Sequence, residues 1–171
     1  MKLVLLRHAT RSAFDMESGP AGESPLNAVG LAQAEDLLNH LSPKGPLPQP
    51  TRLFVSPKLR ARQTLTPLAR ESALKLEVET RLDERNSGES VRDFNDRIKD
   101  LFEELNNTAD ESAVIYLCSH MDWLEAVTTL WPTNMSEREA SMPWSPLEYQ
   151  VFRLREGVLH TLARGHVSPR F

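Results

Sequence analysis

Short apolar runs alternate along this chain with longer stretches in which apolar residues recur at helical spacing. The runs have the length of buried strands, and leucine, valine and isoleucine dominate them. We therefore predict strands at Leu3–Leu6, Leu53–Val55, Leu76–Val78 and Ala113–Cys118.

Four stretches between and after these runs have the apolar periodicity of amphipathic helices. Asn27 suits the N-cap of the first helix, and Ser56 suits that of the second, with Pro57 in its first turn. Ser90 begins a pattern that resembles a capping box, with Asp93 in place of the usual glutamate or glutamine. The predicted helices cover residues 28–41, 57–69, 91–105 and 122–130.

The end of the chain has a different pattern. Tyr149–Leu154 and Val158–Ala163 alternate between apolar and polar residues on either side of Glu156-Gly157, which predicts a β-hairpin. Before the hairpin, Met135–Pro146 has little pattern and is predicted to be a loop. The alternation of strands and helices predicts an α/β fold with three layers: a doubly wound, mainly parallel sheet with helices on both faces and a C-terminal β-hairpin. Since no linker or repeat interrupts the chain, we expect residues 1–171 to form a single domain.

Composition narrows the classes of function. The 171 residues are 40% apolar and carry a formal net charge of -4, so the basic surface of a nucleic-acid-binding protein is not expected. No run approaches the ~20 apolar residues of a membrane-spanning helix, and the N-terminus lacks the long apolar stretch of a secretion signal. With one cysteine, Cys118, no internal disulfide can form. We expect a cytoplasmic monomer that binds neither nucleic acid nor membranes.

Polar residues with a common chemistry follow three of the predicted strands. Arg7 and His8 come directly after the first strand, and Arg60 lies shortly after the second. Ser119 and His120 follow the fourth. If these strands are parallel and adjacent, their carboxyl ends meet at one edge of the sheet, where open α/β sheets bind ligands. The sequence therefore predicts one site with two arginines and two histidines.

This set of side chains suits a phosphoryl group. Arginine offers a fixed fork of donors that fits phosphate oxygens, and neighbouring arginines keep a histidine neutral because like charge disfavours imidazolium. A neutral imidazole can attack phosphorus and hold the phosphoryl group covalently. The remaining donors would stabilise the charge on the phosphoryl oxygens during transfer.

Other chemistries fit the sequence less well. A cysteine-dependent phosphatase places an arginine six residues after its cysteine, where this chain has Leu124 after Cys118. A dinucleotide-binding enzyme needs a glycine-rich turn after the first strand, and Arg7–Thr10 is not one. The histidines lack metal-ligand spacing, which disfavours a metallohydrolase without excluding it, because distant residues can converge. Taken alone, His8 or His120 would more often be a structural residue than a catalytic one.

Segments of the chain, taken together, resemble the histidine phosphatase superfamily, which includes cofactor-dependent phosphoglycerate mutase. The first resembles the Arg-His-Gly signature, the second a phosphate-binding arginine motif, the third the segment with an acid/base glutamate, and the fourth the second histidine motif. In that order they are Leu5–Thr10, Ser56–Thr64, Leu82–Gly88 and Ser119-His120. Their order along the chain is that of the family, which makes the resemblance much more specific than any one segment.

The resemblance implies a metal-independent phosphatase that needs no cofactor and works in two steps. His8 would be the nucleophile, and Arg7, Arg60 and His120 would hold the phosphoryl group while it is bound as phosphohistidine. Glu84 would donate a proton to the leaving oxygen and later activate water.

Two further residues are candidate phosphate ligands. Arg11 lies in the loop after His8, and Ser119 directly precedes His120. Each also has an ordinary interpretation, because Arg11 could be solvated and Ser119 could cap the following helix. Arg62 lies two residues beyond Arg60 and is expected on the surface.

The chain departs from the family's pattern at three positions. Ala9 replaces the usual glycine after the nucleophilic histidine, and alanine adopts a positive φ only at a cost. Met121 stands where a glycine often follows the second histidine, and Phe14 stands where mutases have asparagine. The chain also lacks the long insertions of mutases. These features favour hydrolysis over mutase-type phosphoryl transfer, and they leave open a catalytically inactive member that binds a phosphorylated ligand.

The expected partner is a small-molecule phosphate ester or a phosphorylated protein. The compact length resembles that of small bacterial phosphatases of protein phosphohistidine, but those generally lack a glutamate at the position of Glu84. The loops 10–23 and 132–146 are expected to set specificity, and their sequences match no interpretable pattern.

Overall fold

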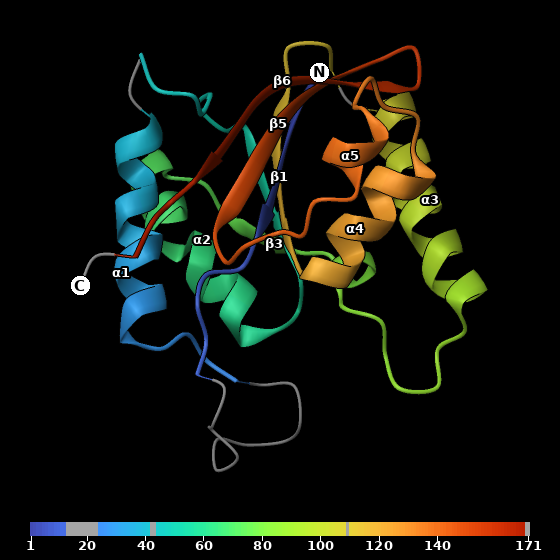
Figure 1. Cartoon of the computed structure of the whole chain (residues 1–171). Coiled ribbons are helices and arrows are strands. Elements are labelled where there is room, and N and C mark those ends of the chain that lie inside the picture. Colours follow the sequence, from blue (N-terminus) through green and yellow to red (C-terminus); the bar gives the residue numbers. More distant parts are fainter. Residues whose placement is uncertain (13–23, 42–43, 109, 170–171) are drawn as a thin grey trace.

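The computed structural model describes residues 1–12, 24–41, 44–108 and 110–169, and these form a central sheet with helices on both faces (Figure 1). The sheet has six strands in the order β3-β2-β4-β1-β5-β6. The strands are β1 (Lys2–Arg7), β2 (Arg52–Val55), β3 (Leu76–Val78), β4 (Val114–Ser119), β5 (Glu148–Arg155) and β6 (Val158–His166).

Strands β1 to β4 pair with one another in parallel, whereas β5 is antiparallel to both β1 and β6. This confirms the predicted α/β class, the mainly parallel sheet and the C-terminal hairpin. The predicted strand bounds differ from the observed ones by up to three residues, as is usual where pairing rather than local sequence sets the ends.

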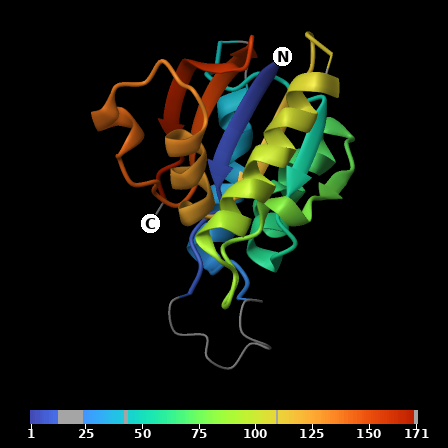
Figure 2. The same cartoon turned by 90° about the vertical axis from the view of Figure 1, so that its right-hand side faces the viewer.

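The helices lie in two groups, one on each face of the sheet. They are α1 (Ala28–Asp36), which continues as the 3-10 helix η1 (Leu37–Leu41), α2 (Leu59–Ser72), the 3-10 helix η2 (Thr80–Leu82), α3 (Val91–Thr108), α4 (Met121–Leu130) and the short α5 (Glu137–Ala140). Helices α1 and α2 cover one face, and α3 and α4 cover the other, as Figures 1 and 2 both show. No helix in the described part of the chain is long and apolar enough to cross a membrane.

Strand β1 explains why the sheet needs helices on both sides. Its successive side chains alternate between two cores, with Val4 and Leu6 in the core under α1 and α2. Leu3 and Leu5 lie in the other core, under α3 and α4, and all four side chains are fully buried. A strand with both faces buried reads as a continuous apolar run, which is the pattern that predicted it.

The second helix begins later than predicted. It starts at Leu59, and its N-cap is Lys58, whose side chain makes no capping hydrogen bond. Ser56 is therefore not the cap: its hydroxyl lies 2.7 Å from Nε2 of His120, a partner 64 residues away in the sequence. Local sequence could not distinguish the two uses of this serine.

Two further details differ from or refine the sequence prediction. The predicted loop 135–146 contains α5, whose N-terminus has a complete capping box between Ser136 and Glu139. The predicted cap of the third helix is confirmed, because Ser90 Oγ accepts a hydrogen bond from the Asp93 amide at 3.0 Å. The predicted loop between the first strand and first helix lies largely outside the described residues.

Candidate active site

The carboxyl ends of three parallel strands meet as the sequence predicts. The amide of His8, after β1, donates to the carbonyl of Ser119 at the end of β4, at 3.0 Å. The amide of Ser56, after β2, donates to the carbonyl of Cys118 in β4, also at 3.0 Å. Since β4 lies between β1 and β2, this pairing places His8, His120 and the start of α2 around one point.

His8 is buried, and its hydrogen bonding fixes which ring nitrogen is free. Its Nδ1 lies 2.8 Å from the carbonyl oxygen of Ala9. A carbonyl only accepts, so Nδ1 carries the proton and Nε2 keeps its lone pair. Burial, followed by the positive charges of Arg60 and Arg7, lowers the pKa of His8 to about 3, against the opposing hydrogen bond to Ala9. His8 is therefore a neutral imidazole with an available nucleophilic nitrogen.

His120 lies against His8, with ring centroids 5.3 Å apart. Its Nδ1 lies 3.3 Å from Nη2 of Arg60, and its Nε2 lies 2.7 Å from Oγ of Ser56. Burial lowers the pKa of His120 to about 2, and the positive charges of Arg60 and Lys58 act in the same direction, as does protonation of His8. In the unliganded site both histidines are neutral.

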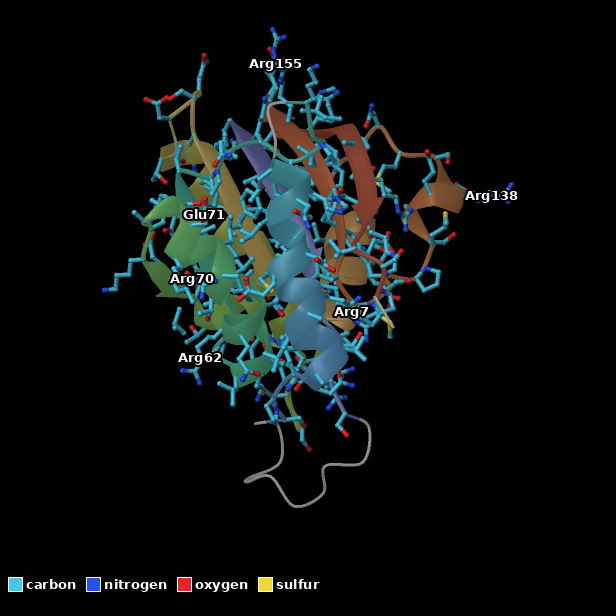
Figure 3. The ribbon with its side chains drawn as sticks, turned by 90° about the vertical axis from the view of Figure 1, so that its left-hand side faces the viewer. Arg7, Arg62, Arg70, Glu71, Arg138 and Arg155 are labelled. Carbon is cyan, nitrogen blue, oxygen red and sulfur yellow. The ribbon has the colours of Figure 1, made fainter. Side chains whose placement is uncertain are left out.

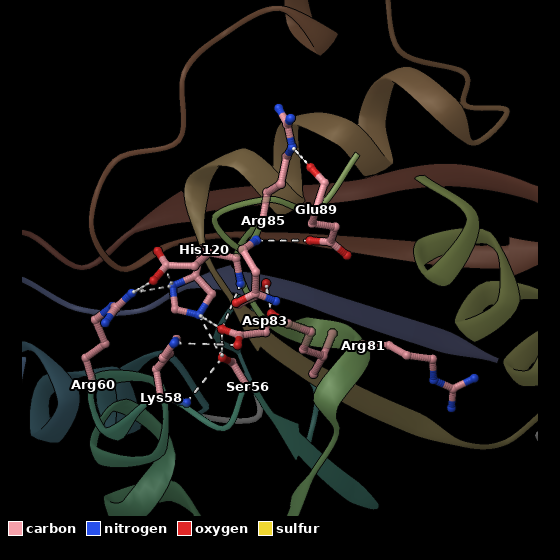
Figure 4. A network of polar contacts seen from close by, with 12 residues as sticks. Ser56, Lys58, Arg60, Arg81, Asp83, Arg85, Glu89 and His120 are labelled. Atoms are coloured by element: carbon pink, nitrogen blue, oxygen red, sulfur yellow. Dashed lines mark hydrogen bonds and ion pairs between the residues drawn. The ribbon is translucent and has the colours of Figure 1, made fainter. Parts of the chain in front are cut away.

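Arg60 and Glu84 form an ion pair of unequal burial (Figure 4). Nη2 of Arg60 donates to Oε1 of Glu84 at 2.7 Å, and the two side chains are 2% and 34% exposed. The other carboxylate oxygen of Glu84 lies 3.9 Å from Nδ1 of His120. The carboxylate thus stands at the entrance of the site and shares the buried guanidinium with His120.

Arg7 enters the site from the end of β1. Its Nη1 donates to the carbonyl of Trp144 at 2.6 Å, which ties the loop before β5 to the site. Its buried Nε has no hydrogen-bond partner among the residues that the structure describes. Burial lowers the pKa of Arg7, and the charges of Arg11 and Arg60 add to that effect. A buried donor of this kind is suited to an anion.

The two weaker candidates lie elsewhere. Arg11 is exposed, and its Nη1 lies 3.4 Å from Oγ of Ser24. Ser119 is fully buried, and its hydroxyl donates to the carbonyl of Leu82 at 2.6 Å, so that it joins β4 to η2. Arg62 lies on the outer side of α2, as does Arg70 (Figure 3). We therefore keep Arg11 as a rim residue and leave Ser119 out of the proposed phosphate ligands.

Asp83, Ser56 and Lys58 were not predicted as residues of the site from the sequence. Asp83 Oδ1 accepts hydrogen bonds from the Glu84 amide at 2.9 Å and from the Ser56 hydroxyl at 3.5 Å. Its Oδ2 lies 3.6 Å from Nζ of Lys58. Burial raises the pKa of Asp83, against the lowering charge of Lys58. The available signal was an acidic residue directly before Glu84 in the same segment, but the sequence does not show which way its side chain points.

The two departures from glycine cause no backbone strain. Among the described residues, the non-glycine residues with positive φ are Ala73, Leu147 and Glu156, so neither Ala9 nor Met121 belongs to them. Ala9 is fully buried, and its amide donates to Oγ1 of Thr64 at 2.9 Å. Alanine thus fills this position without the cost that a positive φ would bring.

Helix α1 holds the start of the loop that follows His8. The amide and the hydroxyl of Thr10 donate to Oε1 of Gln33 at 3.1 and 2.7 Å. A Cβ atom at Gly30 would lie 2.0 Å from the carbonyl oxygen of Thr10, so only glycine permits this approach. The first helix therefore positions the backbone next to His8.

The arrangement combines a neutral nucleophile with a set of cationic donors. Such a site can bind a dianionic phosphoryl group and stabilise charge on its oxygens. Among the described residues, no three histidine, cysteine, aspartate or glutamate side chains are grouped so that they could hold a metal ion.

Comparison with known sequences identifies a family. A sequence model of the histidine phosphatase superfamily (branch 1) matches residues 3–89. These residues include His8, Arg60 and Glu84, while His120 lies beyond the matched segment and is brought to the site by the fold. A comparison with curated proteins gives no match.

Solved structures share the fold over nearly the whole chain. A proposed α-ribazole-5'-P phosphatase from Escherichia coli has a TM-score of 0.76 at 16% identity, covering 98% of this chain and 99% of that one. Mycobacterial glucosyl-3-phosphoglycerate phosphatase in complex with VO3 has a TM-score of 0.74 at 18% identity, with 98% and 99% covered. The protein histidine phosphatase SixA in complex with tungstate has a TM-score of 0.66 at 22% identity, with 96% of each chain covered.

Proposed function

The chain belongs to the histidine phosphatase superfamily, and on that premise we propose that it hydrolyses phosphomonoesters or phosphohistidine through a phosphohistidine at His8. The proposal treats residues 1–171 as a single domain of this family, working without a metal or other cofactor. The observation that carries it is the state of His8: a neutral imidazole whose Nδ1 is engaged by the Ala9 carbonyl, leaving Nε2 for attack. Arg60, Arg7 and Arg11 lie near enough for their charges to lower the pKa of His8, and they could also bind phosphoryl oxygens.

In the first step, Nε2 of His8 attacks phosphorus and the bond from phosphorus to the leaving oxygen breaks. Arg7, Arg60 and His120 would hold the three remaining phosphoryl oxygens. Glu84 in its protonated form would donate its proton to the leaving oxygen, so that an alcohol or a protein imidazole departs. Its position at the entrance of the site, on the side of Arg60 that faces solvent, supports this role.

In the second step, a water molecule attacks the phosphohistidine. Glu84, now a carboxylate, takes a proton from that water as the new oxygen–phosphorus bond forms and the phosphorus–nitrogen bond breaks. Inorganic phosphate leaves and His8 is restored. Glu84 would release its proton when it pairs with Arg60 again in the free site, and would take up a proton when the next substrate displaces it from Arg60. The ion pair between Arg60 and Glu84 supports an exchange at this point, since an incoming phosphoryl oxygen would take the donor that the carboxylate holds in the free site.

The substrate class follows from the same residues only in part. The relatives with the fold include phosphatases of small metabolites and of protein histidine. An acid/base glutamate is needed most for an alcohol leaving group, because an imidazole is a better leaving group than an alkoxide. We therefore place a small phosphate ester before phosphohistidine as the substrate.

Two alternatives remain from the sequence: mutase-type phosphoryl transfer, and a binding protein without catalysis. The presence of both histidines, both arginines and a glutamate in one place favours catalysis over binding alone. The absence of long insertions in the 171 residues favours water over a second substrate as acceptor.

The test is hydrolysis of an aryl phosphate with chelator present, by wild type and by His8→Ala. We expect chelator-resistant activity in the wild type, a loss of about 10³-fold or more in His8→Ala, and an acid-labile phosphoenzyme on rapid quenching of the wild type only. His160→Ala, on the exposed part of β6, is the matched control and should retain activity. Activity that survives in His8→Ala would overturn the mechanism.

A further inference from the structure

Asp83 lies inside the site, yet the proposed steps give it no part. Its side chain is 13% exposed and lies next to Ser56 and Lys58, on the Nε2 side of His120 (Figure 4). A buried carboxylate is costly unless its contacts compensate for the lost solvation. Its contacts therefore indicate what it does for the neighbouring histidine.

The direction of each hydrogen bond can be assigned from chemistry. A guanidinium only donates, so Nδ1 of His120 accepts from Arg60 and the ring proton is on Nε2. Nε2 then donates to Oγ of Ser56, at 2.7 Å. The Ser56 hydroxyl has one proton, and it donates this proton to Oδ1 of Asp83. A directed chain thus runs from His120 through Ser56 to Asp83.

A bound phosphoryl group changes what His120 must do. Phosphoryl oxygens only accept hydrogen bonds, so Nδ1 must carry a proton in order to contact one. If Nε2 keeps the proton that it donates to Ser56, His120 then becomes an imidazolium. If the proton instead moves to Nδ1, Ser56 must donate to Nε2 and loses its hydrogen bond to Asp83. The imidazolium is disfavoured in the free site by burial and by neighbouring cations. The negative charge of the ligand stabilises the imidazolium next to Nδ1. A second negative group is needed next to Nε2.

Charged and titratable groups face His120 from every element around it. They are His8 from the end of β1, Arg11 from the loop beyond it, Lys58 and Arg60 from the start of α2, and Asp83 and Glu84 from the segment after η2. The two carboxylates lie on opposite sides of the ring: Glu84 is 3.9 Å from Nδ1, whereas Asp83 is 3.8 Å from Nε2. A phosphoryl group would occupy the side of Glu84, so Asp83 is the anion that stays beside the imidazolium.

We propose that Asp83, acting through Ser56, is a positioning residue that holds His120 in the orientation and protonation state in which Nδ1 donates to the transferring phosphoryl group. This inference rests on the proposed function. It separates the two adjacent acidic residues: Glu84 exchanges a proton with the leaving group and water, whereas Asp83 touches neither and supports the charge on His120. Lys58, whose Nζ lies 3.6 Å from Oδ2 of Asp83, favours the ionised form of that carboxylate when the site is empty and opposes the effect of burial.

The experiment compares the wild type with Asp83→Asn, which keeps the shape and removes the charge. In the complex with orthovanadate, NMR of ¹³C,¹⁵N-labelled histidine should identify His120 as an imidazolium whose pKa falls by about one unit in Asp83→Asn. The alkaline limb of kcat for an aryl phosphate should move to lower pH by the same amount. Ser56→Ala, which breaks the chain but keeps both charges, should move the limb in the same direction by less.

Asp122→Asn is the matched control, because it removes a carboxylate two residues beyond His120 that has no contact with Ser56 and instead accepts from the amides of Arg85 and Trp123. The alkaline limb should stay in place in this variant. A lower kcat in Asp83→Asn with an unchanged limb and an unchanged His120 signal would overturn the inference and leave a merely structural role. A wild type that neither binds orthovanadate nor hydrolyses esters would overturn the proposed function and this inference together.

Discussion

Two buried ion pairs in this molecule have opposite arrangements. At the candidate active site the cation is buried and the carboxylate is accessible, since Arg60 is 2% and Glu84 is 34% exposed. In the C-terminal hairpin the carboxylate is buried and the cation is accessible, since Glu148 is 8% and Arg164 is 28% exposed. Each pair joins two different segments of the chain, yet we infer that the two pairs have different roles.

The difference lies in which partner an external molecule can replace. Both carboxylate oxygens of Glu148 are engaged, one by Nε of Arg164 at 2.5 Å and the other by the amide of Ser145 at 2.9 Å. At the site, Arg60 is held in the interior, and its carboxylate partner stands at the surface, where an anion from solution can displace it. We therefore interpret the pair of Arg60 and Glu84 as part of the proposed binding site, and the pair of Arg164 and Glu148 as a structural contact.

The largest expected effect is on activity, and it should separate the two arginines. Arg60→Gln should lower kcat/KM for an aryl phosphate by about 10³-fold, because a donor and a charge that stabilise the transferring group are lost. Arg164→Gln should leave kcat/KM within about threefold of wild type, because its partner Glu148 lies outside the proposed machinery. Steady-state hydrolysis under one set of conditions measures both.

The free energy of unfolding should instead depend more on Arg164 than on Arg60. Arg164→Gln leaves the buried carboxylate of Glu148 without its cation and should reduce the free energy of unfolding by about 2 kcal/mol, measured in urea. Comparable losses of activity in the two variants would contradict the distinction between a binding pair and a structural pair. Arg155→Gln, in which an exposed arginine is replaced on the same hairpin, controls for the loss of charge alone.

Sequence patterns found the parts of the site that local order determines. His8 and His120 were predicted because each lies two positions after the end of a fully apolar run, and a buried strand of a parallel sheet delivers the next residues to its carboxyl edge. Arg60 was placed at this edge by its position after the second strand, and the family resemblance favoured it over a surface arginine, since an arginine in the first turn of a helix has no local mark of burial. Glu84 was reached through the resemblance alone. Ser119 was a candidate because it directly precedes His120, but its hydroxyl instead donates to the carbonyl of Leu82.

The contacts behind the site could not be predicted. Ser56 before proline has the pattern of a helix cap, and its actual partner is 64 residues away. Asp83 and Glu84 are adjacent and similar in type, yet one points to Ser56 and the other to Arg60. Tertiary packing decides these directions, and no periodicity in the sequence records them.

A further prediction tests whether phosphate can replace the carboxylate of Glu84 as the partner of Arg60. Glu84→Gln should lower kcat by about 10²-fold, because acid/base catalysis is lost. It should also bind inorganic phosphate more tightly than wild type, by several fold, because phosphate no longer competes with a carboxylate for Arg60. Isothermal titration calorimetry measures the affinity, and thermal unfolding with and without phosphate provides a second readout.

The hairpin supplies the control for that experiment. Added phosphate should not restore the stability that Arg164→Gln loses, because its unpaired group is an anion. Phosphate affinity in Glu84→Gln that is equal to or weaker than that of wild type would show that the carboxylate does not compete for Arg60, and would remove the proposed exchange.

The smallest expected effect concerns pH, and it tests whether His8 is held neutral. The pKa of His8 is lowered to about 3, from an ordinary value of 6.5. Between these values the unfolded chain binds a proton that the folded chain does not, so stability is full above pH 6.5 and falls as pH falls towards 3. From pH 6.5 to 5.5 this one group should lower the free energy of unfolding by about 1 kcal/mol.

Urea unfolding of wild type and His8→Asn in phosphate-free buffer isolates the contribution of His8, since the variant should lose that part of the pH dependence. Parallel pH profiles for the two proteins would mean that His8 protonates in the folded state as easily as in the unfolded one, and a nucleophile that charges so readily would not fit the mechanism proposed here.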